Sequence, residues 1–206
     1  MPLTYLALGD SYTIGEGVPA AGRWPVQLAA RLRDEGVPLA APTILATTGW
    51  TTDELSAAMD AATFSPPYAL VSLLIGVNNQ YRGRDEDEYR TTFGDLLARA
   101  VTLAGGRAGH VVVVSIPDWG VTRFAHEGGR DRAAIAAALD RHNAIAHAAT
   151  RAAGAAFVDI TDLSRAWPDE LAADGLHPDA RQYARWAARL APAVRAALAD
   201  RAMPSP

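Results

Sequence analysis

The chain has 206 residues, of which 50% are hydrophobic and 20% charged, as is ordinary for a globular protein. This length suits one α/β domain with a single sizeable core, and we place that domain at residues 1–200, followed by a disordered tail at 201–206. The formal net charge of −4 argues against a nucleic-acid partner, and the absence of cysteine excludes disulfides and thiolate–metal sites. No apolar run is as long as a membrane span and no signal-like segment precedes the first predicted strand, so we expect a cytoplasmic protein.

The first predicted strand covers residues 3–8, an apolar run that stops at Gly9 and Asp10. Ser11 follows directly. A residue just past the carboxyl end of a first strand lies where open α/β sheets bind their ligands. Ser11 is therefore a candidate nucleophile on a turn, although serine also caps helix N-termini, and both interpretations remain open at this point.

Gly15 and Gly17 loosely fit a dinucleotide-binding fingerprint. Pro19 falls where the helix of that motif should begin, and Glu16 would face the pyrophosphate. We therefore interpret this stretch as a flexible loop and expect no cofactor.

The next elements alternate between helix and strand. We predict a helix around residues 24–33, a strand at 43–46, a helix opening at Thr52, and a strand at 68–75. The last run is almost continuously apolar, which is typical of a central parallel strand buried on both faces. Loops carrying Gly49 and Asn78 follow the second and third strands, as Ser11 follows the first.

The second half continues the alternation with a helix at 85–103, a strand at 110–116, a helix at 130–153, a strand at 155–160 and a helix at 178–199. Between them, residues 117–129 show no clear period, so we predict a long loop that forms a wall of the pocket. His142 and His147 lie five apart and do not share a helix face as metal ligands would, so we predict no metal site.

Asp174 and His177 are the second chemical signal, near the other end of the chain. Serine needs an adjacent base to act as a nucleophile, and that base is usually a histidine oriented by a carboxylate. A spacing of three lets one short turn hold both side chains on the same side. Gly175 permits the bend, and Pro178 suits the start of the following helix.

Four blocks of this chain, in order, resemble the SGNH hydrolases, also called GDSL-type esterases or lipases. They are Gly9-Asp10-Ser11, Gly49 within residues 47–51, Asn78 within residues 75–80, and Asp174-x-x-His177. The resemblance implies a catalytic triad of Ser11, Asp174 and His177. It also implies an oxyanion hole formed by Ser11, Gly49 and Asn78.

The chain departs from the family pattern at Tyr12, where leucine is usual, and at Asn79, where aspartate is commoner. Alternating strands and helices predict a three-layer α/β/α sandwich with a parallel sheet. The resemblance implies five strands in the flavodoxin-like order 2-1-3-4-5. We place the substrate pocket at Tyr12, Trp50, Asn79 and Trp119.

The residue types indicate acyl transfer by serine, and the chain has no Gly-x-Ser-x-Gly elbow of the α/β-hydrolase kind. We expect an esterase whose substrate is a small-molecule ester with a short acyl group, such as acetyl. A thioesterase or lysophospholipase of the same family is the alternative within this chemistry. A non-catalytic binding module on the same fold is the alternative from another class. The oligomeric state stays open.

Overall fold

Five parallel strands form one sheet in the order β2-β1-β3-β4-β5 in a computed structural model, which describes residues 2–199. The predicted order is therefore confirmed. The tail predicted at 201–206 lies outside the described residues. The strands are β1 (Tyr5–Gly9), β2 (Thr43–Ala46), β3 (Leu70–Leu74), β4 (Val111–Val114) and β5 (Ala156–Val158).

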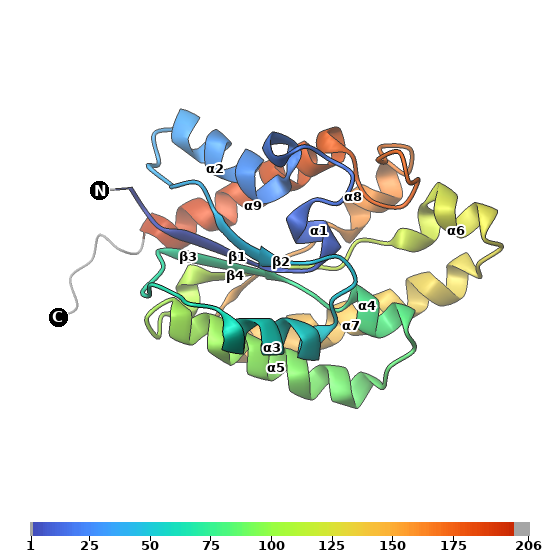
Figure 1. The fold of residues 1–206 in the computed structure, drawn as a ribbon, viewed down its shortest axis with the longest axis horizontal. Helices are drawn as coiled ribbons and strands as arrows, with labels where there is room; N and C mark the ends of the chain where they lie inside the picture. Colours follow the sequence, from blue (N-terminus) through green and yellow to red (C-terminus); the bar gives the residue numbers. More distant parts are fainter. Residues whose placement is uncertain (1, 200–206) are drawn as a thin grey trace.

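Helices cover both faces of this sheet (Figure 1). The longer ones are α2 (Trp24–Asp34), α3 (Thr52–Ala61), α5 (Glu86–Leu103), α7 (Arg132–Ala153) and α9 (Ala180–Ala199). The shorter ones are α1 (Ser11–Ile14), α4 (Val77–Tyr81), α6 (Arg123–Glu127) and α8 (Thr161–Ala166), with the 3₁₀ turns η1 (Ala20–Gly22), η2 (Ala108–His110) and η3 (Trp119–Val121). α2 and α9 lie together on one face, and α3, α5 and α7 lie on the other.

Alternate residues of the central strands supply two separate cores. In β1, Tyr5 and Ala7 belong to the core under α2 and α9, whereas Leu6 and Leu8 belong to the core under α3, α5 and α7. All four side chains are buried because helices lie on both sides of the sheet. A parallel strand in this position is therefore apolar at nearly every residue, which explains the almost continuous apolar runs in the sequence.

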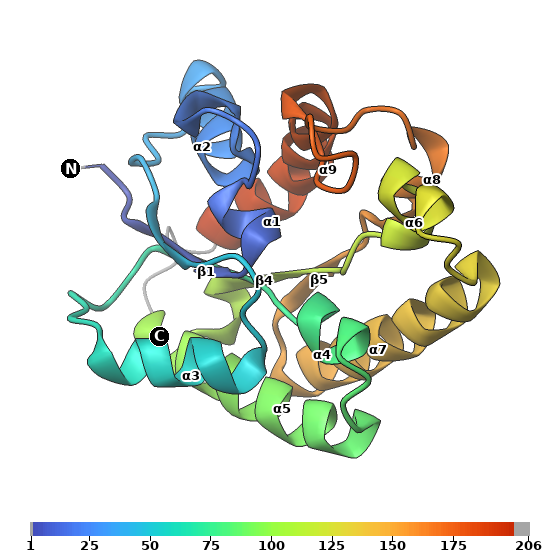
Figure 2. The same ribbon diagram turned by 45° about the vertical axis from the view of Figure 1, so that its right-hand side comes forward.

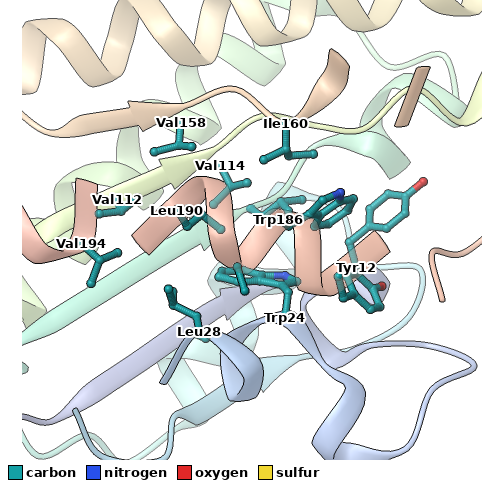
Figure 3. Close-up of a cluster of buried hydrophobic side chains, with 14 of the residues drawn as sticks. Tyr12, Trp24, Leu28, Val112, Val114, Val158, Ile160, Trp186, Leu190 and Val194 are labelled. Carbon is teal, nitrogen blue, oxygen red and sulfur yellow. The ribbon is translucent and has the colours of Figure 1, made fainter. Parts of the chain in front are cut away.

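The core under α2 and α9 contains two buried tryptophans (Figure 3). Trp24 begins α2, and Trp186 lies on α9. Both are fully buried, in a cluster that also contains aliphatic side chains of α2, α9, β4 and β5. Tyr12 of α1 lies beside Trp186, with 6.1 Å between the ring centroids. The short helix α1 is therefore fixed to the core of the sandwich.

Several short helices occupy stretches where we predicted loops or no regular element. Residues 117–129 contain η3 and α6, Asn78 lies within α4, and α8 follows β5. Four to six residues are too few to display a 3.6-residue hydrophobic period, and tertiary packing stabilises such short helices. α1, α4 and α6 all lie on the side toward which the strand arrows point (Figure 1).

Two long helices begin two residues later than predicted, because an aspartate caps each of them. Asp131 accepts a hydrogen bond from Ala134 N at 3.0 Å, and α7 starts at Arg132. Asp179 accepts from Gln182 N at 3.1 Å, and α9 starts at Ala180. An N-cap residue lies outside the helix that it stabilises, so each predicted boundary moves inward.

Candidate active site

Ser11 is the first residue of α1, two residues after Gly9 at the carboxyl end of β1. Asp10, not Ser11, is the N-cap: its Oδ1 accepts a hydrogen bond from Tyr12 N at 3.0 Å. The interpretation of Ser11 as a helix cap is therefore wrong. The first N–H groups of any helix have no intrahelical acceptor, so the backbone N–H of Ser11 is available to an incoming oxygen.

His177 and Asp174 form a hydrogen-bonded pair in the loop that precedes α9. His177 Nδ1 lies 2.7 Å from Asp174 Oδ2. The other carboxylate oxygen, Oδ1, accepts from the backbone N–H groups of Leu176 at 2.9 Å and His177 at 3.0 Å. Tyr12 packs edge-on against the imidazole, with 5.6 Å between the ring centroids. Both the carboxylate and the imidazole are thus held in one orientation.

The charge of Asp174 fixes the tautomer of this histidine. Partial burial alone would raise the pKa of Asp174, but the hydrogen bonds from the His177 ring and from the Leu176 and His177 N–H groups outweigh burial and hold that pKa below its ordinary value. An ionised carboxylate can only accept, so His177 Nδ1 carries the proton in the pair. In neutral His177, Nε2 is then unprotonated and can act as a base.

The two predicted oxyanion-hole residues lie on adjoining elements. Asn78 is the second residue of α4, and its Nδ2 donates to Trp50 O at 2.9 Å. A side-chain amide has two N–H donors, so one remains for a ligand. Gly49 lies in the loop after β2 with a φ of +89°, which strongly favours glycine, and Arg82 Nη2 donates to its carbonyl at 2.6 Å.

One cavity of about 210 Å³ brings these residues together. Ser11, Gly49, Asn78 and His177 all line it, although they come from four separate segments of the chain. Its other walls are mainly apolar or aromatic: Tyr12, Thr48, Val77, Tyr81, Trp119, Phe124 and Leu176. His177 is the one ionisable side chain other than tyrosine among these lining residues.

Of the four predicted pocket residues, two line this cavity and two do not. Tyr12 and Trp119 contribute to its wall, and the Trp119 indole Nε1 is fixed by donating to Gln80 Oε1 at 2.8 Å. Trp50 packs against the core under α3 and α5 instead. Only its backbone carbonyl contacts the site, by accepting from Asn78.

Asn79 points away from the cavity, so its placement in the pocket is wrong. The side chain is fully buried: Oδ1 accepts from Thr52 N at 3.1 Å, and Nδ2 donates to Thr52 Oγ1 at 2.8 Å. Consecutive residues on a helix point about 100° apart, so when Asn78 faces the cavity its neighbour cannot. Asn79 instead joins α4 to the first turn of α3.

The sequence did not single out Tyr81 or Leu176 as cavity residues. Tyr81 lies three residues after Asn78 on α4, and residues three apart share a helix face. This spacing places Tyr81 beside Asn78 only when residues 77–81 are known to be helical. Leu176 lies between Asp174 and His177, so the bend of that loop determines where its side chain points.

Among residues 2–199, no three side chains of the metal-ligating types cluster as a metal site would require, and none of the helices is long and apolar enough to cross a membrane. Both histidines of α7 pack against aromatic rings. His142 lies against Tyr89 and His147 against Phe157, with centroid distances of 4.7 and 4.8 Å.

Sequence comparison identifies the class of the protein. A family model described as the GDSL-like lipase/acylhydrolase family matches residues 7–185, which defines a carboxylic ester hydrolase. The chain belongs to this family, as its four motif blocks implied. No curated protein sequence matches the chain.

Solved structures share the whole fold at low sequence identity. A structure of TesA is 19% identical with a TM-score of 0.73, over 95% of this chain and 99% of the other. A lipase/acylhydrolase from Enterococcus faecalis is 16% identical with a TM-score of 0.74, over 99% of both chains. An acetyl xylan esterase, AlAXEase, is 16% identical with a TM-score of 0.72, over 93% of this chain and all of the other. At these identities the likeness establishes the fold alone.

Proposed function

We propose that this chain is a serine esterase that hydrolyses small acyl esters, with Ser11 as nucleophile, His177 as base and Asp174 as its orienting carboxylate. One observation carries the proposal. A histidine whose Nδ1 lies 2.7 Å from a carboxylate lines the same 210 Å³ cavity as a serine at a helix N-terminus. This is the arrangement that activates a serine hydroxyl.

In the acylation step, Ser11 Oγ attacks the carbonyl carbon of the ester while His177 Nε2 takes the hydroxyl proton. The tetrahedral intermediate collapses, the bond to the leaving alcohol breaks, and His177 returns the proton to the alcohol oxygen. In deacylation, His177 Nε2 takes a proton from a water molecule as the water oxygen attacks the acyl carbon. The bond from that carbon to Ser11 Oγ then breaks, His177 returns the proton to Oγ, and the carboxylic acid is released. Asp174 stabilises the imidazolium that forms in both steps.

The oxyanion of the intermediate needs donors that are already in place. The backbone N–H of Ser11, the backbone N–H of Gly49 and the free Nδ2–H of Asn78 are the proposed donors. Hydrogen bonds to other residues hold two of these donors in place: the Asn78 amide donates to Trp50 O, and Arg82 donates to the Gly49 carbonyl. Preorganised donors require no rearrangement during reaction, and they usually supply the largest catalytic contribution.

The size and lining of the cavity support a small, neutral substrate. Pockets that bury drug-sized ligands span roughly 300–1,000 Å³, and this cavity of about 210 Å³ is smaller. Its apolar and aromatic walls favour an uncharged acyl or alcohol group. Two of the structures with this fold are named as esterases of acetylated xylan or xylooligosaccharide, which fits short acyl esters. We therefore propose acyl groups of about two to four carbons.

A fluorophosphonate probe tests the nucleophile directly. We expect mass mapping to find the label on Ser11 in the wild-type protein and no label after Ser11→Ala. Hydrolysis of short nitrophenyl esters should fall by about 10³-fold or more in Ser11→Ala, because the nucleophile is lost. Absence of both labelling and hydrolysis in the wild-type protein would favour a binding module on this fold.

A panel of acetyl, longer acyl, thioester and lysophospholipid substrates tests the substrate class. We expect the highest kcat/KM for short oxygen esters. A preference for thioesters or for lysophospholipids would overturn that assignment while leaving the serine mechanism in place.

A further inference from the structure

The helix α6 contacts the loop that carries Asp174 and His177. Phe124 N donates to Gly175 O at 2.9 Å. Arg123 Nη2 donates to Ala173 O at 3.0 Å. These two carbonyls belong to the residues on either side of Asp174. Figures 1 and 2 show α6 near the orange segment between α8 and α9 that contains this loop.

The Arg123 guanidinium also packs directly on the backbone of Gly175. Gly175 has a φ of +68°, and a methyl group added there would lie 2.6 Å from Arg123 Nε. Any side chain at this position would therefore displace the guanidinium or the loop. The absence of a side chain at Gly175 serves both the bend of the loop and the close approach of Arg123.

The other hydrogen bonds of residues 172–177 lie within the loop itself. Ala172 N donates to His177 O at 2.7 Å, and Gly175 N donates to Ala172 O at 3.0 Å. These bonds set the shape of the loop. Within the described part of the chain, the two bonds from α6 are those that reach residues 172–177 from a distant helix or strand. Together with the packing of Tyr12 on the His177 imidazole, they hold the loop in place relative to the sheet.

We propose that Arg123 is a positioning residue for the Asp174–His177 pair. The proposal rests on the proposed function for its effect on turnover. Arg123 does not line the cavity, so it acts through the loop and not on the substrate. Catalytic groups must stay within about 0.5 Å of productive geometry, and a misplacement of about 1 Å can cost 10²-fold in rate.

The first test compares turnover in two arginine variants. We expect Arg123→Ala to lower kcat by about 10- to 100-fold with little change in KM, because the pair is displaced while the cavity remains. Arg123→Lys should retain more activity, since an ammonium can still donate to Ala173 O. Added guanidinium ion should partly restore Arg123→Ala. The side chain of Arg123 is 58% exposed, so its removal should leave the fold intact.

Arg189→Ala is the matched control. Arg189 is also a partly exposed arginine that donates to a backbone carbonyl, Asp159 O at 3.1 Å, and pairs with a carboxylate, Asp162 at 3.0 Å. It lies on α9 and does not line the cavity. We expect Arg189→Ala to keep wild-type kcat. Equal losses of kcat in both variants, together with equal losses of thermal stability, would reduce Arg123 to a structural role.

The second test does not depend on activity. The Nδ1 proton of His177, held by Asp174, should give a proton NMR signal far downfield of the amide region. We expect Arg123→Ala to broaden or remove this signal and Arg189→Ala to keep it. If Arg123→Ala keeps the signal, or keeps wild-type kcat, the proposal is overturned. If the wild-type protein hydrolyses no ester, the proposed function fails, and the NMR comparison still decides whether Arg123 positions the pair.

Discussion

Asn78 and Asn79 are neighbours on α4, and their side chains contact different parts of the molecule. Asn78 lines the cavity and donates one hydrogen bond to Trp50 O. Asn79 is fully buried and makes two hydrogen bonds to Thr52 at the start of α3. Substitutions of these two amides should therefore affect different properties: the reaction for Asn78, and the stability of the fold for Asn79.

We expect Asn78→Ala to lower kcat by roughly 10²–10³-fold with little change in KM, because an oxyanion donor acts only in the transition state. Asn79→Ala should keep most of kcat and lower the free energy of unfolding by about 1–3 kcal/mol, because it leaves the buried N–H of Thr52 without a partner. Steady-state kinetics and denaturant unfolding of both variants check this. A rise in KM with unchanged kcat in Asn78→Ala would assign Asn78 to substrate binding instead.

Asp10 is a fully buried carboxyl group, directly beside the nucleophile in sequence. Its Oδ1 caps α1, and its Oδ2 is buried with no hydrogen-bond partner among the described residues. Burial raises the pKa of Asp10 to about 7, against the lowering effect of the backbone N–H of Tyr12. Between about pH 4 and pH 7, the folded protein thus keeps a proton on Asp10 that the unfolded chain has already released.

The sign of the resulting pH dependence follows from proton binding. Between about pH 4 and pH 7 the folded state binds more protons at Asp10 than the unfolded state does, so the contribution of Asp10 to stability falls as pH rises. Asp10→Asn keeps a side-chain oxygen for the cap and does not titrate. We expect the stability of the wild-type protein relative to Asp10→Asn to decrease from pH 4.5 to pH 7.5. Urea unfolding of both proteins at several pH values measures this, and a constant difference would contradict it.

At the scale of elements, η3 and α6 form one aromatic wall of the cavity. Trp119 lies at the centre of this wall, edge-on to Tyr81 at 5.4 Å and tilted against Phe124 at 6.4 Å between ring centroids. Its Nε1 bond to Gln80 ties η3 to α4. The segment that we predicted to be an irregular loop is thus a packed structure that limits the cavity.

We expect Trp119→Ala to extend the range of accepted acyl groups beyond about four carbons. Each methylene that enters the space left by the indole should contribute ~0.8 kcal/mol to binding. The measurement is kcat/KM across nitrophenyl esters of increasing length. Trp50→Ala is the control, because Trp50 does not line the cavity and its loss should leave the length preference unchanged. A steady rise through eight carbons in the wild-type protein would refute a closed acyl site.

At the scale of the whole molecule, stability depends on the two cores between the sheet and its helices. Trp186 of α9 is fully buried and packs edge-on against Tyr183 at 5.0 Å between ring centroids. Trp167, in contrast, is 42% exposed, with the Arg185 guanidinium 3.5 Å from its ring centroid. The two tryptophans thus differ mainly in how much surface each buries.

Trp186→Ala should lower the free energy of unfolding by about 3–5 kcal/mol, because a large buried side chain is replaced by a cavity. Trp167→Ala should cost less than about 1 kcal/mol, since the exposed ring contributes little burial. Chemical denaturation of both variants gives the comparison. Similar losses in the two proteins would mean that burial does not account for their contributions.

The family motifs and the strands could both be predicted from the sequence. Residues 5–9 are apolar without interruption, and residues 70–74 are interrupted only by Ser72, whose buried hydroxyl is hydrogen-bonded to Tyr5. A sheet covered on both faces requires such strands. The short helices could not be predicted from the sequence. Each of α1, α4, α6 and α8 is at most six residues long and depends on contacts with the sheet edge. The same limitation placed Asn79 in the cavity, since the direction of a side chain follows from the helix that carries it.

The sequence by itself determined the strand and helix alternation, the sheet that this alternation builds, and the four motif blocks that identify the family. These features are local: each depends on residue types within a few positions along the chain. Only the tertiary structure decided which side chains line the cavity and that Arg123 contacts the Asp174 loop. Arg123 and Ala173 are 50 residues apart, and their contact depends on how α6 and the loop before α9 pack against the sheet. No local period or spacing in the sequence encodes that packing, because it results from the burial of both segments over a common core.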